Sequence, residues 1–198
     1  MKRSSPMFSF TLIELLIVVA IIGILAAIAV PNFLNAQIRA QIAKAESEMQ
    51  ALGTALEMYH MDKNHYPLFV GPDGVNINPV NRRLIPLTTP VAYISSVPQD
   101  PFLKTRYGVR IVENQHEAYV TYDYVDAWSI INHGKRAVVG SSLRCSEWQI
   151  SGAGPDNNAD TYGTAPLYDA SNGLKSWGDM YRLGPPTSFP CDDSLVGI

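Results

Sequence analysis

The stretch from Phe10 to Val30 is a continuous apolar run that carries one charged side chain, Glu14. About 20 apolar residues in a helix, at 1.5 Å per residue, cross the roughly 30 Å hydrocarbon core of a bilayer. The run therefore predicts a membrane-spanning helix. An ionised side chain in a bilayer costs on the order of 2.5–3.5 kcal/mol, so we expect Glu14 to have a positively charged partner, most simply on another subunit.

Lys2 and Arg3 precede the apolar run, and no acidic residue comes before Glu14. Because positive charge is retained on the cytoplasmic side, this predicts a single-pass inner-membrane protein with its C-terminal part in the periplasm or outside the cell. Two simpler interpretations remain. Residues 27–29 (Ala-Ile-Ala) look like the cleavage site of a secretory signal. A plain uncut anchor would also explain the run, but not the position of Glu14.

A helical pattern continues beyond Pro31. Apolar residues alternate at spacings of four and three, whereas the charged residues fall elsewhere around the helix. The sequence therefore predicts one helix of about 75 Å over residues 10–62, with residues 10–31 in the membrane and residues 32–62 amphipathic. We expect the apolar stripe to pack on the domain that follows, although packing between helices of different subunits is an alternative near the membrane. The stripe comprises Ile38, Ile42, Ala45, Met49, Leu52, Leu56 and Tyr59.

Residues 63–198 are sufficient for one extracytoplasmic domain. A turn at residues 65–67 is expected to end the long helix, and a short helix is predicted over residues 81–87. Segments rich in β-branched and aromatic residues then predict strands. The expected fold is α+β and pilin-like, with a small antiparallel sheet packed on the long helix and a long C-terminal loop region. The predicted strands are residues 107–112, 118–125 and 145–150, with a short piece at Val138-Val139.

The chain has two cysteines, Cys145 and Cys191, both in the part expected outside the cytoplasm. An even number of cysteines in an oxidising compartment favours a disulfide, and two free thiols are the alternative. The formal net charge of the chain is −3, and the sequence contains no run of basic residues. We therefore expect no nucleic-acid partner.

The N-terminal motif Phe10-Thr11-Leu12-Ile13-Glu14, followed by the apolar run and Pro31, resembles the N-terminus of type IV pilins and type II secretion pseudopilins. The resemblance implies that a prepilin peptidase removes a nine-residue cytoplasmic leader (residues 1–9) by cutting between Ser9 and Phe10, and that the new amine of Phe10 is methylated. It also implies that Glu14 meets this amine on a neighbouring subunit and sets the register of a filament. Ser9 departs from the family pattern, which has Gly there.

Gly23 and Pro31 bracket a stretch in which the helix is expected to be weaker, because Pro removes a hydrogen bond and Gly costs roughly 1 kcal/mol relative to Ala. Our hypothesis is that this stretch loses helical order when subunits assemble. A mere kink at the membrane exit is the alternative.

Residues 65–67 (His-Tyr-Pro) and the motif Pro98-Gln99-Asp100-Pro101-Phe102 resemble the major, G-type pseudopilin. That resemblance implies a structural subunit of a type II secretion pseudopilus that drives protein export. Its implied partners are further copies of itself, the membrane, the inner-membrane assembly platform and minor pilins or pseudopilins. A type IV pilin for adhesion, motility or DNA uptake is the alternative.

An acidic loop over residues 151–184 is the candidate ligand site. It combines carboxylates with many Gly, Ser and Asn residues, which suits calcium, because Ca²⁺ takes six to eight oxygen ligands. The spacing is not that of an EF-hand. A solvated loop in which Asp and Asn cap turns is the alternative. The resemblance to G-type pseudopilins also implies calcium in this loop. The candidate ligands are Asp156, Asp160, Asp169 and Asp179.

The sequence gives little support for catalysis. The four histidines show no H-x-x-x-H or H-E-x-x-H spacing, and the chain contains neither G-x-S-x-G nor C-x-x-C. We therefore expect no enzyme. Two functions of other classes remain as alternatives, a membrane-tethered enzyme and a monomeric calcium-binding surface module.

Overall fold

The computed structural model of the chain describes residues 11–106, 109–110, 120–133, 145–159 and 166–188. By its internal contacts the chain divides into two compact units, residues 1–39 and 40–198. Helix α1 (Leu12–Lys63) belongs to both units and confirms the predicted long helix. The helix ends where expected, because Asn64 adopts a left-handed conformation with φ of 58° and donates its N–H to the carbonyl of His60 at 2.8 Å.

The predicted apolar stripe is buried along the C-terminal half of α1. Ala45, Leu52 and Leu56 are completely inaccessible to solvent, and Met49 is nearly so. These side chains share one core with aromatic and aliphatic residues of the sheet. The sheet-side members include Tyr122, Tyr124, Trp148 and Ile150.

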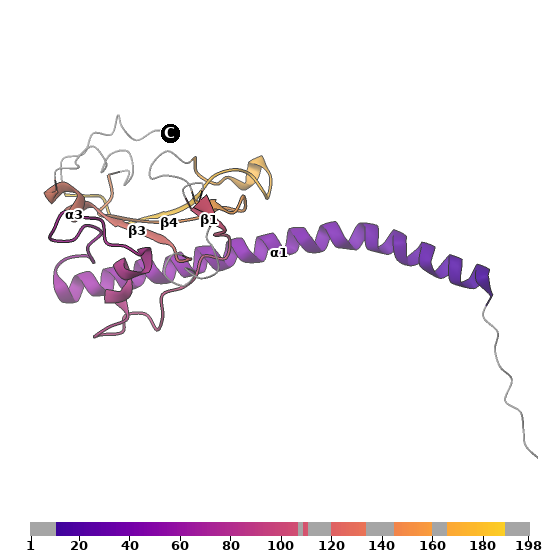
Figure 1. Cartoon of the computed structure of the whole chain (residues 1–198), viewed down its shortest axis with the longest axis horizontal. Coiled ribbons are helices and arrows are strands. Elements are labelled where there is room, and N and C mark those ends of the chain that lie inside the picture. The colour runs from indigo at the N-terminus through magenta and orange to yellow at the C-terminus, as the bar shows by residue number, and fades with distance from the viewer. Residues whose placement is uncertain (1–10, 107–108, 111–119, 134–144, 160–165, 189–198) are drawn as a thin grey trace, which may run out of the picture. The chain divides into compact units, whose positions relative to one another are not determined.

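The sheet that covers this stripe has three antiparallel strands in the order β3-β4-β6. They are β3 (Asp123–Asp126), β4 (Trp148–Gly152) and β6 (Met180–Leu183). Strands β3 and β4 lie along the C-terminal half of α1 (Figure 1). This arrangement confirms the α+β class with a small antiparallel sheet on the long helix. Strand β6 was not predicted from the sequence.

A second, smaller sheet has the order β2-β1-β5. Its strands are β1 (Thr105–Arg106), β2 (Val109–Arg110) and β5 (Asn158–Ala159). Strands β1 and β2 are antiparallel, whereas β1 and β5 run parallel. The parallel pair connects the segment after the P-x-D-P-F motif to the acidic loop.

Several predicted elements differ in extent from the observed ones. The strand predicted from residue 145 starts at Trp148, because Cys145 has a φ of 57°, a left-handed conformation that a strand does not accept. The strand predicted over residues 118–125 is observed from Asp123, and helix α3 (Ala127–Asn132), which was not predicted, follows it. Most of the strand predicted over residues 107–112 and the piece at Val138-Val139 lie outside the described residues.

The short helix predicted over residues 81–87 is observed as two 3₁₀ turns, η1 (Val80–Arg83) and η2 (Ile85–Leu87). Pro86 lies within the second turn and lacks the N–H that a continuous α-helix would need there. A further 3₁₀ turn, η4 (Ala170–Asn172), lies in the acidic loop.

Carboxylates on α1 accept hydrogen bonds from aromatic side chains of the domain. The Tyr122 hydroxyl donates to Glu48 at 2.7 Å. Glu57 receives two donors, the indole N–H of Trp148 at 2.8 Å and the hydroxyl of Tyr66 at 3.1 Å. Burial, together with the adjacent carboxylates, raises the pKa of Tyr66 and of Tyr122 well above the usual value, so both hydroxyls remain donors. These directional bonds fix the register of the helix against the sheet in a way that apolar contacts alone do not.

Gly53 allows the close approach of helix and sheet at this point. A Cβ atom at position 53 would lie 3.0 Å from the Trp148 ring and 2.8 Å from Nε of Arg182. A larger residue would therefore displace both side chains.

We predict that Glu57→Ala destabilises the domain by about 1–3 kcal/mol, because it leaves the partly buried donors of Tyr66 and Trp148 without an acceptor. Glu57→Gln keeps one acceptor oxygen and is expected to cost less. Urea unfolding of the full-length protein in detergent, followed by tryptophan fluorescence, measures both. Glu46→Gln on the exposed surface is the matched control, and equal stability of Glu57→Ala and this control would contradict the role assigned to Glu57.

Candidate functional site: the assembly helix and the acidic loop

The first part of α1 exposes apolar side chains on all sides. Ile17, Ile22 and Leu25 are between 53% and 61% exposed, and the same holds broadly from Leu12 to Leu34. The helix is long and apolar enough to cross a membrane. A helix that is apolar around its whole circumference needs lipid or other helices around it.

Glu14 forms a capping box with Thr11 at the start of α1. Its carboxylate accepts hydrogen bonds from the Thr11 N–H at 2.8 Å and from the Thr11 hydroxyl at 2.6 Å, and the N–H of Glu14 donates to that hydroxyl at 3.3 Å. The S/T-x-x-E spacing is the sequence signal that would have predicted this arrangement. Ser9 and Phe10 lie outside the described residues. The pairing of Glu14 with an amine therefore stays a prediction.

Gly23 and Pro31 both lie within continuous helix. A Cβ atom at Gly23 would meet nothing within 4 Å. The structure thus shows this stretch in its helical form, and loss of helical order on assembly remains a hypothesis about the filament.

The acidic loop brings Asp156 to the turn that precedes β6. One carboxylate oxygen of Asp156 accepts from the N–H of Asn158 at 3.1 Å, and the other accepts from the N–H of Gly178 at 3.4 Å. A Cβ atom at Gly154 would lie only 1.9 Å from the Gly178 carbonyl oxygen, so this approach requires glycine. Asp179, which is buried, follows Gly178 directly. Two of the four predicted calcium ligands therefore lie on adjoining segments.

Of the other two candidate ligands, the structure describes Asp169. Asp169 is exposed and caps η4, where its carboxylate accepts from the N–H of Ser171 at 2.8 Å. That hydrogen bond lowers the pKa of Asp169 below its usual value. Asp160 lies outside the described residues. Across the described ranges, no group of three His, Cys, Asp or Glu side chains is placed to hold a metal ion. The calcium site stays a prediction.

The P-x-D-P-F motif holds the beginning of the acidic loop. Asp100 is buried, and its carboxylate accepts from the N–H of Phe102 at 2.9 Å and from the N–H of Ala153 at 2.6 Å. The N–H of Lys104 then donates to the carbonyl of Asn157 at 3.2 Å. A motif noted in the sequence only for its family resemblance thus has a structural role.

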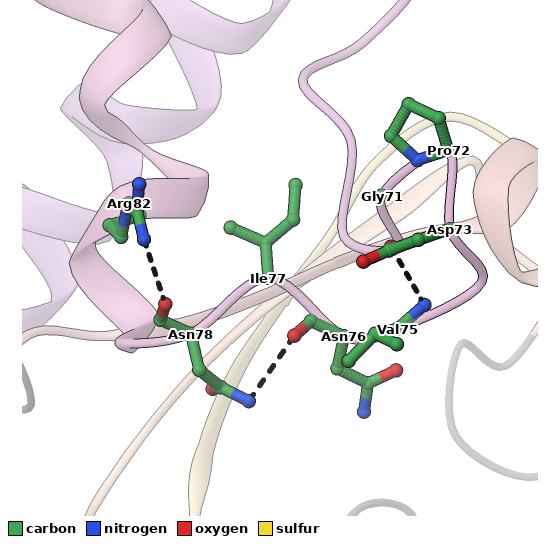
Figure 2. Close-up of a pocket in the computed structure, with 8 residues that line it drawn as sticks. All are labelled: Gly71, Pro72, Asp73, Val75, Asn76, Ile77, Asn78 and Arg82. Atoms are coloured by element: carbon green, nitrogen blue, oxygen red, sulfur yellow. Dashed lines mark hydrogen bonds between the residues drawn. The ribbon is translucent and has the colours of Figure 1, made fainter.

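A surface depression lies beside the loop of residues 71–78 (Figure 2). Its polar groups bond to one another: the Asp73 carboxylate accepts from the N–H of Val75 at 3.1 Å, and Arg82 donates to the carbonyl of Asn78 at 3.4 Å. The Asp73 carboxylate and the Arg82 guanidinium both form hydrogen bonds with neighbouring backbone groups, and this pair alone does not indicate a catalytic site. The depression is a consequence of how this loop folds.

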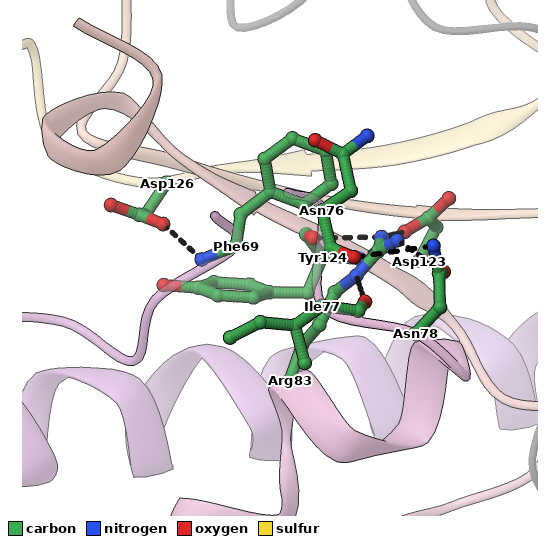
Figure 3. A network of polar contacts seen from close by, with 8 residues as sticks. All are labelled: Phe69, Asn76, Ile77, Asn78, Arg83, Asp123, Tyr124 and Asp126. Carbon is green, nitrogen blue, oxygen red and sulfur yellow. Dashed lines mark hydrogen bonds and ion pairs between the residues drawn. The ribbon is translucent and has the colours of Figure 1, made fainter. Parts of the chain in front are cut away.

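A buried polar network stands behind that loop (Figure 3). Arg83 pairs with Asp123, and both side chains are almost inaccessible to solvent. The guanidinium also donates to the carbonyl of Ile77 at 2.8 Å and to Asn78 at 3.0 Å, and it lies 4.5 Å from the centre of the Phe69 ring. A buried cation with this many partners ties η1 to β3. No local pattern predicted this network, because Arg83 and Asp123 lie 40 residues apart in the chain.

Asp126 caps α3 from its buried position at the end of β3. Its carboxylate accepts from the N–H of Ser129 at 2.8 Å, from the Ser129 hydroxyl and from the N–H of Phe69 at 2.6 Å. Burial raises the pKa of Asp126, while these hydrogen bonds oppose the increase. The Asp-x-x-Ser spacing before an apolar segment is a helix-start signal that the sequence reading missed.

Two of the described histidines, His60 and His65, line one surface depression together with Glu147. His60 stacks on Tyr66 with ring centres 4.3 Å apart, and Nδ1 of His133 bonds to the carbonyl of Ser129 at 2.7 Å. His116 lies outside the described residues. Cys145 is disulfide-bonded, and its predicted partner, Cys191, lies outside the described residues.

Comparisons with known proteins identify similar families and relatives. The family model for type II secretion system protein G matches residues 32–124, and the prokaryotic N-terminal methylation motif matches residues 9–30. Type II secretion system core protein G of Escherichia coli K12 is 29% identical over 152 residues, which cover 76% of this chain and 97% of that protein. No solved structure matches the chain.

Two further relatives represent the two families that the sequence resembles, the protein G family and the type IV pilins. Core protein G of Vibrio cholerae is 36% identical over 103 residues, which cover 52% of this chain and 70% of that protein. The type IV major pilin PilA of Myxococcus xanthus is 51% identical, but only over 65 residues, which cover 33% of this chain and 30% of the pilin. The similarity to protein G thus extends well beyond the stretch shared with the pilin, and the chain belongs to the type II secretion system protein G family.

Proposed function

We propose that this chain is the structural subunit of a type II secretion pseudopilus, which assembles through its N-terminal helix to drive protein export. The proposal rests on the contrast between the N-terminal and C-terminal parts of α1. Residues 12–34 of α1 expose apolar side chains, whereas residues 45–56 bury one face under the domain. Such a helix gives a membrane-anchored subunit whose apolar part is free to pack with copies of itself.

A type IV pilin for adhesion, motility or DNA uptake is the second candidate. It is favoured by the matches to pilins, each of which covers about a third of this chain. The protein G model, by contrast, continues through residue 124 and includes the P-x-D-P-F motif. That extent favours the secretion pseudopilus.

Maturation would create the partner of Glu14. A cut between Ser9 and Phe10 frees an amine one residue before Thr11, and the methylation motif that begins at residue 9 supports this position. Prepilin peptidase is the expected enzyme for the cut and for methylation of Phe10. The C-terminal domain would lie in the periplasm, since Lys2 and Arg3 favour a cytoplasmic start.

Assembly would exchange one set of partners of Glu14 for another. Among the described residues of one chain, the backbone N–H and hydroxyl of Thr11 bond to the carboxylate, and no cationic side chain pairs with it. The Phe10 amine of a neighbouring subunit would supply that charge. In an apolar bundle, a charge pair specifies register more than it adds stability. The inner-membrane assembly platform and minor pseudopilins are the expected partners in this step.

Calcium would stiffen the acidic loop. Asp156 and Asp179 are the first candidate ligands, because they lie on adjoining segments. Asp160 and Asp169 are further candidates, and backbone carbonyls would complete the shell. The arrangement is compatible with an oxygen-ligand ion, because Asp156 already joins the loop to the turn before β6. Bound calcium would neutralise carboxylates there and hold that turn.

We predict that Glu14→Gln reduces assembled filaments at least about tenfold, because removing one member of a buried ion pair costs about 3–5 kcal/mol. Glutamine keeps an oxygen that can accept from Thr11, so membrane insertion should be unchanged. Filaments sheared from cells, quantified against total subunit, give the measurement. Thr11→Val is the matched variant that removes the capping hydroxyl and keeps the charge. If Thr11→Val lost filaments to the same extent while Glu14→Gln retained them, the capping box and not the charge would be the essential feature.

We predict that millimolar calcium raises the melting temperature of the full-length protein in detergent relative to excess EDTA. A ligand at 100 times its dissociation constant stabilises a protein by about 2.7 kcal/mol, which corresponds to a shift of several degrees. Asp156→Asn should abolish the shift, whereas Asp73→Asn, which alters an exposed carboxylate in another loop, should keep it. Identical melting temperatures in EDTA and calcium would refute the site.

A further inference from the structure

Arg182 is held against helix α1 by its aliphatic stem. It lies on β6 opposite Ile150 of β4. A Cβ atom at Gly53 would lie 2.8 Å from Nε of Arg182 and 3.4 Å from its Cδ, so the side chain crosses the helix backbone at this glycine. The absence of a side chain at Gly53 provides the room for it.

The guanidinium of Arg182 has no acceptor in the part of the chain that the structure describes. Its Nε is buried and makes no hydrogen bond, and no ion pair includes it. Arginine stays charged and carries five N–H donors in a rigid fork that matches a carboxylate. The residue as a whole is only partly buried. A cation fixed in this way is prepared for an incoming carboxylate.

Glu46 is the complementary group. Among the described residues, every other carboxylate accepts a hydrogen bond, whereas Glu46 is exposed and makes neither a hydrogen bond nor an ion pair. Glu46 precedes Gly53 by seven residues, which places it about 10 Å away along α1 and within about 20° around the helix axis. The two opposite charges therefore lie along the same edge of one helix, without pairing to each other.

We propose that Arg182 of one copy forms an ion pair with Glu46 of an adjacent copy in the filament. This inference rests on the proposed self-assembly. Parallel copies displaced along their helix axes by about two turns would bring the guanidinium of one level with the carboxylate of the other. The pair would set the stagger of the outer domains, independently of Glu14 at the N-terminal end of the helix. Complementary charges at an interface fix register and exclude wrong pairings.

The test uses charge reversal in the full-length protein. Glu46→Arg and Arg182→Glu should each lower the filament yield several-fold, and the double variant should restore it to within about twofold, because the exchanged charges can pair again. Arg182→Met keeps the stem against Gly53 and removes the charge, so it should lose filaments without unfolding. Lys104→Glu, at an exposed cation on another segment, is the control and should assemble normally.

Melting of the same variants as detergent-solubilised monomers distinguishes an interchain pair from an intrachain one. We expect the changes in monomer stability caused by the two single substitutions to add in the double variant. Rescue of monomer stability would place the pair within one chain, and full assembly of Arg182→Met or a double variant no better than the single ones would overturn the proposal. If the unaltered protein and Lys104→Glu also failed to form filaments, the proposed assembly itself would be wrong.

Discussion

The domain depends on the burial of one face of the C-terminal half of α1. Ala45, Leu52 and Leu56 form a surface that is completely closed to solvent, and the three-stranded sheet covers it. Apolar contact supplies most of the driving force, at about 25 cal/mol per Å² of buried area. It does not by itself specify a register. Trp148 and Tyr122 supply both functions, because each belongs to the core and donates a hydrogen bond to a helix carboxylate.

The first half of the same helix has the opposite property. In the part of the chain that the structure describes, its apolar side chains are exposed, and Glu14 bonds to Thr11 at the start of its own helix. Lipid satisfies the apolar surface of a single subunit but not the charge. A bundle of like helices satisfies the apolar surface, and the neighbouring amine would satisfy the charge. In our account, this difference directs a protein of the protein G family from the membrane into a filament.

The sequence pattern was sufficient for the long helix and its buried stripe, because both follow from local periodicity over many turns. The same pattern predicted the strands of the sheet less well. Strand β6 lies in a segment rich in Gly and Asp and is defined by its pairing with β4, which periodicity does not reveal. The Arg83–Asp123 pair joins residues 40 positions apart, so no local rule could find it. Two local signals were available and overlooked, the capping pairs of Thr11 with Glu14 and of Asp126 with Ser129.

The acidic loop shows a further limit of composition. Four Asp residues are candidate ligands, and in the structure Asp169 caps η4 while Asp156 bonds to the turn before β6. A short polar side chain can cap a turn or coordinate an ion, and the surrounding backbone determines which of the two it does. Asp100 illustrates the same point, since its buried carboxylate organises the loop without being part of it.

The central claim is that Glu14 changes its partner on assembly. The most direct measurement is a cryo-electron microscopy map of the filament that resolves side chains in the helix bundle. The account predicts the Glu14 carboxylate within about 4 Å of the Phe10 amine of a neighbouring subunit, the distance of an ion pair. A map in which Glu14 still bonds to its own Thr11, with every Phe10 amine elsewhere, would contradict it.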